Sequence, residues 1–74
     1  MLHETKPLII EGELNEDRNT VLIAEDNDEL RNFIGDLLKA DYNLILAVNG
    51  HEGAKAAFKY LPDIIVSDVM MPDM

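Results

Sequence analysis

The 74-residue chain contains no cysteine and no tryptophan, and its six lysine and arginine residues stand against fifteen acidic ones. Without cysteine, neither a disulfide nor a thiolate metal site can stabilise the fold. The formal net charge of −9 argues against direct binding to nucleic acid or anionic lipid, because phosphate contacts require lysine and arginine. No apolar run approaches the ~18 residues of a membrane span, and a signal peptide's basic and apolar regions are missing. The chain is expected to form one small cytoplasmic domain that makes no membrane contact.

The first 19 residues differ in composition from the rest. They are rich in acidic residues, and their one apolar patch, Leu8-Ile9-Ile10, follows Pro7. We interpret residues 1–19 as an acidic linker or flexible arm. The alternative, that the patch adds to a sheet as an edge strand, stays open because isolated short apolar runs are ambiguous.

Residues 20–74 alternate short apolar runs with helical patterns. Unbroken apolar runs predict buried strands at residues 20–24, 44–48 and 64–67. The first helix is predicted to start at a cap formed by Asn27 or Asp28, and the second at Asn49. The apolar face predicted for the first helix comprises Leu30, Phe33, Ile34, Leu37 and Leu38, with Arg31, Asn32, Asp36 and Lys39 facing water. The apolar face predicted for the second comprises Ala54, Ala57, Phe58 and Leu61.

The order strand, helix, strand, helix, strand predicts an α/β fold with a parallel sheet and right-handed crossovers. Pattern alone allows the strand orders 1-2-3 and 2-1-3. The first and third strands end in acids, Glu25-Asp26 and Asp68, whereas the second runs into Asn49-Gly50. Because ligands bind where the ends of strands meet at a switch point, we predict three parallel strands in the order 2-1-3, with the two helices on opposite faces.

In this arrangement Glu25, Asp26 and Asp68 converge at one edge of the sheet. Carboxylates in one crevice repel one another and favour a hard cation such as Mg²⁺. With the cation bound, a neighbouring carboxylate can attack phosphorus and form an aspartyl-phosphate. The alternative is that these are solvent-facing acids at strand ends. A phosphate-ester hydrolase is disfavoured, because a general acid is often needed two residues after the nucleophile, and Met70 cannot transfer a proton.

Two segments, VLIAEDN at 21–27 and SDVMMPDM at 67–74, resemble the first two motif blocks of bacterial response-regulator receiver domains. The resemblance covers residues 20–74 and implies a partial receiver domain with a truncated flavodoxin-like fold. It implies that Asp68 is the phosphoacceptor for a phosphohistidine of a sensor histidine kinase. It further implies that Asp26 is a direct Mg²⁺ ligand, that Glu25 acts on the metal mainly through water, and that the backbone carbonyl of Met70 completes the ligands.

A full receiver has five βα units in the order 2-1-3-4-5, and this chain supplies three strands and two helices. The family's Thr or Ser after strand 4 and its Lys after strand 5 fall outside the chain. Since a hydroxyl and an ammonium would stabilise charge on the phosphoryl group, we expect weak Mg²⁺ binding and poor phosphorylation. We also expect self-association through the exposed edge of the third strand.

The resemblance leaves the role of the chain open between two readings. The preferred parent protein is a hybrid sensor kinase with an attached receiver. The second choice is a response regulator with a separate output domain. Whether the chain has enzymatic activity stays open: by itself it is not expected to be a conventional enzyme, although its parent could be a hybrid histidine kinase. The alternative is a non-catalytic interaction or scaffold fragment in which the acidic site is a relic.

Overall fold

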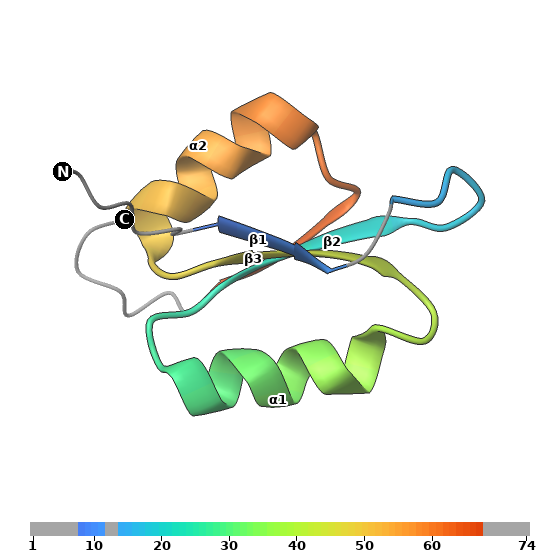
Figure 1. The fold of residues 1–74 in the computed structure, drawn as a ribbon. Coiled ribbons are helices and arrows are strands. Elements are labelled where there is room, and N and C mark those ends of the chain that lie inside the picture. Colours follow the sequence, from blue (N-terminus) through green and yellow to red (C-terminus); the bar gives the residue numbers. More distant parts are fainter. Residues whose placement is uncertain (1–7, 12–13, 68–74) are drawn as a thin grey trace, which may run out of the picture.

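A four-stranded sheet lies between two helices (Figure 1). The computed structural model describes residues 8–11 and 14–67. The elements in chain order are β1 (Leu8–Glu11), β2 (Thr20–Ala24), α1 (Asp28–Leu38), β3 (Asn43–Ala47), α2 (Gly50–Tyr60) and β4 (Ile64–Ser67). The predicted alternation of strands and helices is confirmed over residues 20–67, with β3 beginning and ending one residue earlier than expected. The expectation that the third strand is buried is wrong: Ile64 and Ile65 are exposed, because β4 is the edge strand of the described sheet.

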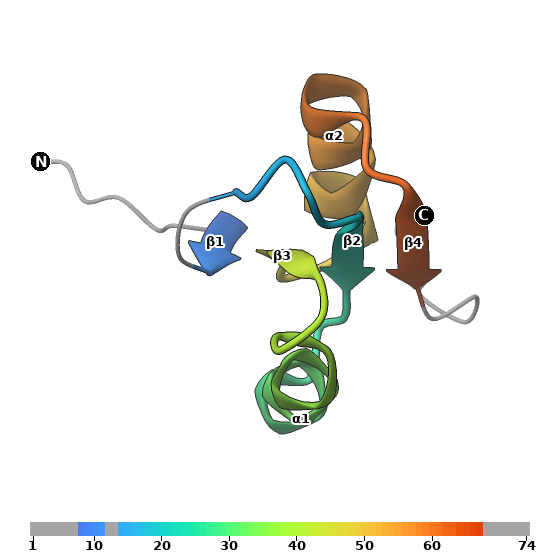
Figure 2. The ribbon, with the colours of Figure 1, turned by 90° about the vertical axis from the view of Figure 1, so that its right-hand side faces the viewer.

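The sheet has the strand order β1-β3-β2-β4. β3, β2 and β4 are parallel, and β2 pairs with β3 from Thr20↔Asn43 and with β4 from Val21↔Ile64. Figure 2 shows the strands in this order, with α1 on one face of the sheet and α2 on the other. The predicted order 2-1-3 of the three parallel strands, with helices on opposite faces, is therefore confirmed.

Strand β1 confirms, for Leu8–Glu11, the edge-strand alternative to the interpretation of residues 1–19 as an acidic linker or flexible arm. Residues Leu8–Glu11 pair antiparallel with β3, from Leu8↔Ala47 to Glu11↔Leu44. The edge strand that the sequence left open is therefore the correct interpretation of this segment. The addition satisfies backbone groups on the outer edge of β3, which would otherwise be available for pairing with another chain.

The core has two layers, one on each face of β2 and β3. Because successive side chains of a strand point to opposite faces, each strand contributes to both layers. The layer beneath α2 contains Leu22, Ala24, Ile45, Ala47 and Ala56. The layer above α1 contains Val21, Ile23, Leu44 and Leu46. Burial on both faces explains why β2 and β3 read as continuous apolar runs.

The predicted apolar face of α1 is only partly correct. The buried or half-buried residues of this helix are Arg31, Ile34, Gly35 and Leu38. Leu30, Phe33 and Leu37 are 44%, 60% and 64% exposed. The expectation that Arg31 faces water is wrong. A Cβ placed on Gly35 would lie 3.6 Å from the Leu44 side chain, so the glycine face approaches the sheet closely and turns the larger apolar residues outward.

A glycine that allows close approach to the sheet also changes which face of α2 contacts the core. Of the four residues predicted to form it, Ala57 packs against the core, whereas Ala54, Phe58 and Leu61 are exposed. The helix instead buries Gly50, Gly53 and Ala56. At Gly53 a Cβ would lie 2.6 Å from the Cβ of Ala24, so α2 sits directly on β2. Both predicted N-caps are confirmed, at Asn27 and Asn49.

Hydrogen bonds connect the starts of the parallel strands at the amino-terminal edge of the sheet. The Asn43 side chain donates to the carbonyls of Asn15 and Arg18 at 2.8 and 3.1 Å and accepts from the Asn15 amide at 2.7 Å. The Thr20 amide donates to the Asp63 carboxylate at 2.8 Å, and the Asp63 amide donates to the Thr20 carbonyl at 2.9 Å. These bonds fix the starts of β2, β3 and β4, and with them the register at the opposite, carboxyl-terminal edge.

Candidate functional site

Glu25 and Asp26 leave the carboxyl end of β2 in different environments. The Glu25 amide donates to the Ala47 carbonyl at 3.1 Å, which continues the pairing one residue beyond the strand. Glu25 is only 7% exposed, and its Oε2 accepts a hydrogen bond from the Asn27 amide at 3.0 Å. Asp26 is exposed, and no hydrogen bond or ion pair within residues 14–67 engages its carboxylate. The structure therefore offers one anchored and one available carboxylate.

Asn27 joins this turn to α1. Its Oδ1 accepts from the Leu30 amide at 2.9 Å, satisfying one of the free N–H groups at the start of the helix. Asp28 and Glu29 occupy the first turn, where negative charge is favoured by the helix dipole. The two candidate ligands are thus only two and three residues before the first residue of a capped helix, Asp28.

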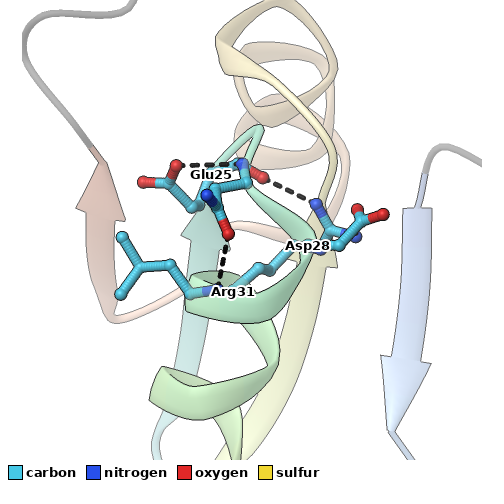
Figure 3. A network of polar contacts seen from close by, with 5 residues as sticks. Glu25, Asp28 and Arg31 are labelled. Carbon is cyan, nitrogen blue, oxygen red and sulfur yellow. Dashed lines mark hydrogen bonds and ion pairs between the residues drawn. The ribbon is translucent and has the colours of Figure 1, made fainter.

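Arg31 is the residue of this region that sequence reasoning missed. Figure 3 shows its side chain beside Glu25 and Asp28. Nη1 donates to the Glu25 carbonyl at 2.8 Å, and Nη2 forms an ion pair with Asp28. Nε has no hydrogen-bond partner among the described residues. The available signal was the spacing of Arg31 from Ile34 and Gly35, which places all three on one side of the helix.

The other predicted site residues, Asp68 and Met70, lie outside the described residues. In the described part of β4, Ser67 is paired with Ala24, and Asp68 is the next residue in the sequence. Across residues 8–11 and 14–67, no three histidine or acidic side chains form a group that could hold a metal ion. The convergence of Glu25 and Asp26 with Asp68 therefore stays a prediction.

The carboxylate oxygens of Asp26 and Glu25 are of the ligand type that a hard divalent cation prefers. The carboxylate of Asp26 and Oε1 of Glu25 accept no hydrogen bond from the part of the chain that the structure describes, and the nearby Arg31 directs its donors to a backbone carbonyl and to Asp28. Oxygen ligands of this kind suit Mg²⁺, which commonly takes one or two carboxylates and keeps several waters. If bound, the ion would be held by Asp26 directly, with Glu25 available through water.

The comparisons with known proteins point to two-component signalling. No protein-family model matches the chain, and no solved structure matches it significantly. "Histidine kinase P4" of Formosa agariphila is 43% identical over 76 residues, which cover 96% of this chain and 6% of that protein. "Hybrid signal transduction histidine kinase D" of Dictyostelium discoideum is 44% identical over 54 residues, covering 73% of this chain and 4% of that protein.

A relative with a different printed name also matches most of this chain. "Protein-glutamate methylesterase/protein-glutamine glutaminase 1" of Syntrophomonas wolfei is 34% identical over 58 residues, which cover 74% of this chain and 16% of that protein. The chain therefore spans only a small part of each of these relatives. Its similarity to proteins with different printed activities is typical of a shared module.

The strand order, the two motif blocks and these similarities agree on one family. The chain belongs to the receiver domains of two-component signal transduction and contains the first three parallel strands and two helices of that fold. Neither helix in the described part of the chain is long and apolar enough to cross a membrane.

Proposed function

We propose that the chain is the phosphoacceptor part of a two-component phosphorelay, in which Asp68 receives a phosphoryl group from a phosphohistidine of a sensor histidine kinase. One observation carries the proposal: β2 and β4 are parallel neighbours, and Ala24 is paired with Ser67. These two residues directly precede Glu25 and Asp68 in the sequence. Neighbouring parallel strands that each lead into acidic residues are the arrangement that a shared cation site requires.

Each acidic residue has a distinct role in the proposed reaction. The Asp68 carboxylate attacks phosphorus, so that an O–P bond forms as the P–N bond to the donor histidine breaks and the imidazole leaves. Asp26, which is exposed and unengaged within the described residues, binds Mg²⁺ directly. Glu25 is anchored by the Asn27 amide and acts through a water molecule. The Met70 carbonyl is the remaining protein ligand. When bound, Mg²⁺ would offset negative charge on the transferred group.

The setting of this reaction is part of the proposal. Two of the three relatives described above are named as histidine kinases, one of them as a hybrid, which supports a hybrid sensor kinase as the parent protein. A chain without cysteine is compatible with the reducing cytoplasm, where a kinase phosphohistidine would be its partner.

The test is phosphoryl incorporation from a small donor such as acetyl phosphate in the presence of Mg²⁺. We expect incorporation at least about 100-fold slower than in an intact receiver, because the hydroxyl and ammonium that would stabilise the transferred group are not in the chain. Asp68→Asn should abolish it, whereas Asp41→Asn, in the exposed turn after α1, should not. Incorporation that survives in Asp68→Asn would exclude Asp68 as the acceptor. Uptake at the rate of an intact receiver would refute the expected slow reaction.

We further propose that a second copy of the chain pairs with β4. Ile64 and Ile65 lie on opposite faces of this strand and are 40% and 55% exposed, and no described strand pairs with its outer edge. Beside Ile65 lies an apolar hollow of about 90 Å³ between α2 and β4. An exposed apolar strand edge favours pairing with another chain.

Sedimentation velocity over a range of concentrations tests this association. The wild-type sedimentation coefficient should rise with concentration, and Ile65→Lys should shift the equilibrium toward monomer because a charged residue at a strand edge opposes pairing. Phe58→Lys is the matched control, since Phe58 is 84% exposed on α2 rather than on the edge strand. A wild-type monomer at every concentration, or an equal effect of both substitutions, would contradict edge pairing.

A further inference from the structure

Arg31 occupies an unusual environment for a cation on a surface helix. The residue is 5% exposed, although it lies in the first half of α1. Burying a guanidinium is unfavourable unless its charge and donors find partners. Its partners are the carbonyl of Glu25 at 2.8 Å and the carboxylate of Asp28. The two partners flank the turn that contains Asp26 and Asn27, so one side chain spans the whole turn (Figure 3).

Two further bonds restrain the same turn from within. The Asn27 amide donates to Glu25 Oε2 at 3.0 Å, and the Asn27 side chain accepts from the Leu30 amide at 2.9 Å. Neither bond involves the Asp26 carboxylate, which remains exposed. The turn is therefore fixed through its backbone and through Glu25, while the carboxylate proposed to bind the ion directly stays available.

We propose that Arg31 is a positioning residue for the cation site. Its guanidinium holds the Glu25 carbonyl and the start of α1 in one arrangement, so that the carboxylates of Glu25 and Asp26 are held in place before the ion arrives. The inference deepens the proposed function and rests on it for the identity of the ion. It assigns a role to a side chain that does not itself contact the metal.

A positioning role and simple electrostatics predict opposite changes in Mg²⁺ affinity when the positive charge of Arg31 is removed. A guanidinium near a cation site repels the ion, so an arginine without a positioning role would weaken Mg²⁺ binding, and Arg31→Met would strengthen it. If Arg31 positions the turn, Arg31→Met weakens binding although the site becomes more negative. Arg31→Lys keeps the charge but loses the planar fork that reaches two partners, so it should weaken binding as well.

The experiment is calorimetric titration of the full chain with Mg²⁺ for the wild type, Arg31→Met and Arg31→Lys. We expect the dissociation constant to rise about tenfold in both variants, the scale typical of losing a residue that orients a metal ligand. Lys39→Met is the matched control: Lys39, the C-cap residue of the same helix, pairs with Asp36 at the same i,i+3 spacing, but with side chains 60% and 73% exposed. It removes one positive charge and should leave the affinity within about twofold. Unchanged or tighter binding in Arg31→Met would overturn the proposal.

Amide hydrogen exchange without metal provides a second readout and separates this inference from the proposed function. The Asn27 and Leu30 amides report on the two bonds inside the turn, and the amides of β3 report on the core. Arg31→Lys should accelerate exchange at Asn27 and Leu30 at least about tenfold and leave β3 unchanged. If the wild type binds no Mg²⁺, the proposed cation site fails, and accelerated exchange confined to the turn still supports positioning by Arg31. Unchanged exchange at the turn, or equal acceleration throughout the sheet, overturns it.

Discussion

Gly53→Ala is expected to lower the free energy of unfolding by about 2 kcal/mol, the balance between two effects of the added methyl group. It would be placed 2.6 Å from the Ala24 Cβ, and overpacking of this kind typically costs about 1–3 kcal/mol. The steric cost is expected to lie near the upper end of this range, about 3 kcal/mol. The Ala24 Cβ is attached to the backbone of a central strand and cannot rotate away. The higher helix propensity of alanine raises the free energy of unfolding by about 1 kcal/mol and so offsets part of this cost. Urea unfolding followed by circular dichroism measures the difference.

Gly35→Ala is the matched control on the other helix. A Cβ at Gly35 would meet Leu44 and Leu46 at 3.6 and 3.7 Å, an ordinary contact distance, so the helix propensity should dominate. We expect this substitution to raise the free energy of unfolding by up to about 1 kcal/mol. Combining Gly53→Ala with Ala24→Gly should recover part of the lost stability, because it removes the opposing methyl group. Equal effects of the two glycine substitutions would show that close approach of α2 to β2 is not the cause.

Asp26→Asn is expected to weaken Mg²⁺ binding by at least about tenfold while the fold remains intact. The carboxylate is the proposed direct ligand, and an amide oxygen carries no charge to replace it. Stability should change little because Asp26 is exposed and makes no hydrogen bond or ion pair with the described residues. Calorimetry gives the affinity, and thermal unfolding without metal shows whether the fold is preserved.

Asp41→Asn controls for the loss of one negative charge from a chain of net charge −9. Asp41 follows the carboxyl end of α1, whereas Asp26 precedes its amino end. Eleven helical residues separate the two regions, about 16 Å at 1.5 Å per residue, which exceeds the screening length of about 10 Å at 0.1 M salt. An equal loss of Mg²⁺ affinity in Asp26→Asn and Asp41→Asn would indicate that the ion is attracted by the overall negative charge and not by a specific site. A wild type that binds no Mg²⁺ would favour a scaffold fragment with a relic acidic site.

The strands and their order could be predicted because the relevant signals are local. Continuous apolar runs marked β2 and β3, and acids at the ends of the first and third runs selected the order of the parallel strands. β1 could be proposed only as an alternative, since its four residues gain their stability from pairing with β3, which lies far along the chain. A short apolar patch does not reveal whether such a partner edge is free.

The helix faces could not be predicted in the same way because the pattern weighs only large apolar residues. Gly35 and Gly53 carry no side chain, yet they determine how closely the helices approach the sheet and therefore which neighbours are buried. Arg31 is buried on such a face because the turn before the helix supplies its partners. Helical spacing from Gly35 could have raised the possibility of burial, but the hydrogen bond to the Glu25 carbonyl depends on the tertiary path of the turn.

The proposed function requires that Asp26 and Asp68 bind one divalent ion. The most direct test is to titrate the ¹⁵N-labelled chain with substoichiometric Mn²⁺, whose paramagnetism broadens the amide signals nearest to it, and to reverse the effect with Mg²⁺. We expect the signals of Asp26 and Asp68 to broaden together, before those of Asp36 and Asp41, and to recover together. Broadening at Asp26 without Asp68, or uniform broadening at all acidic residues, would contradict a shared site.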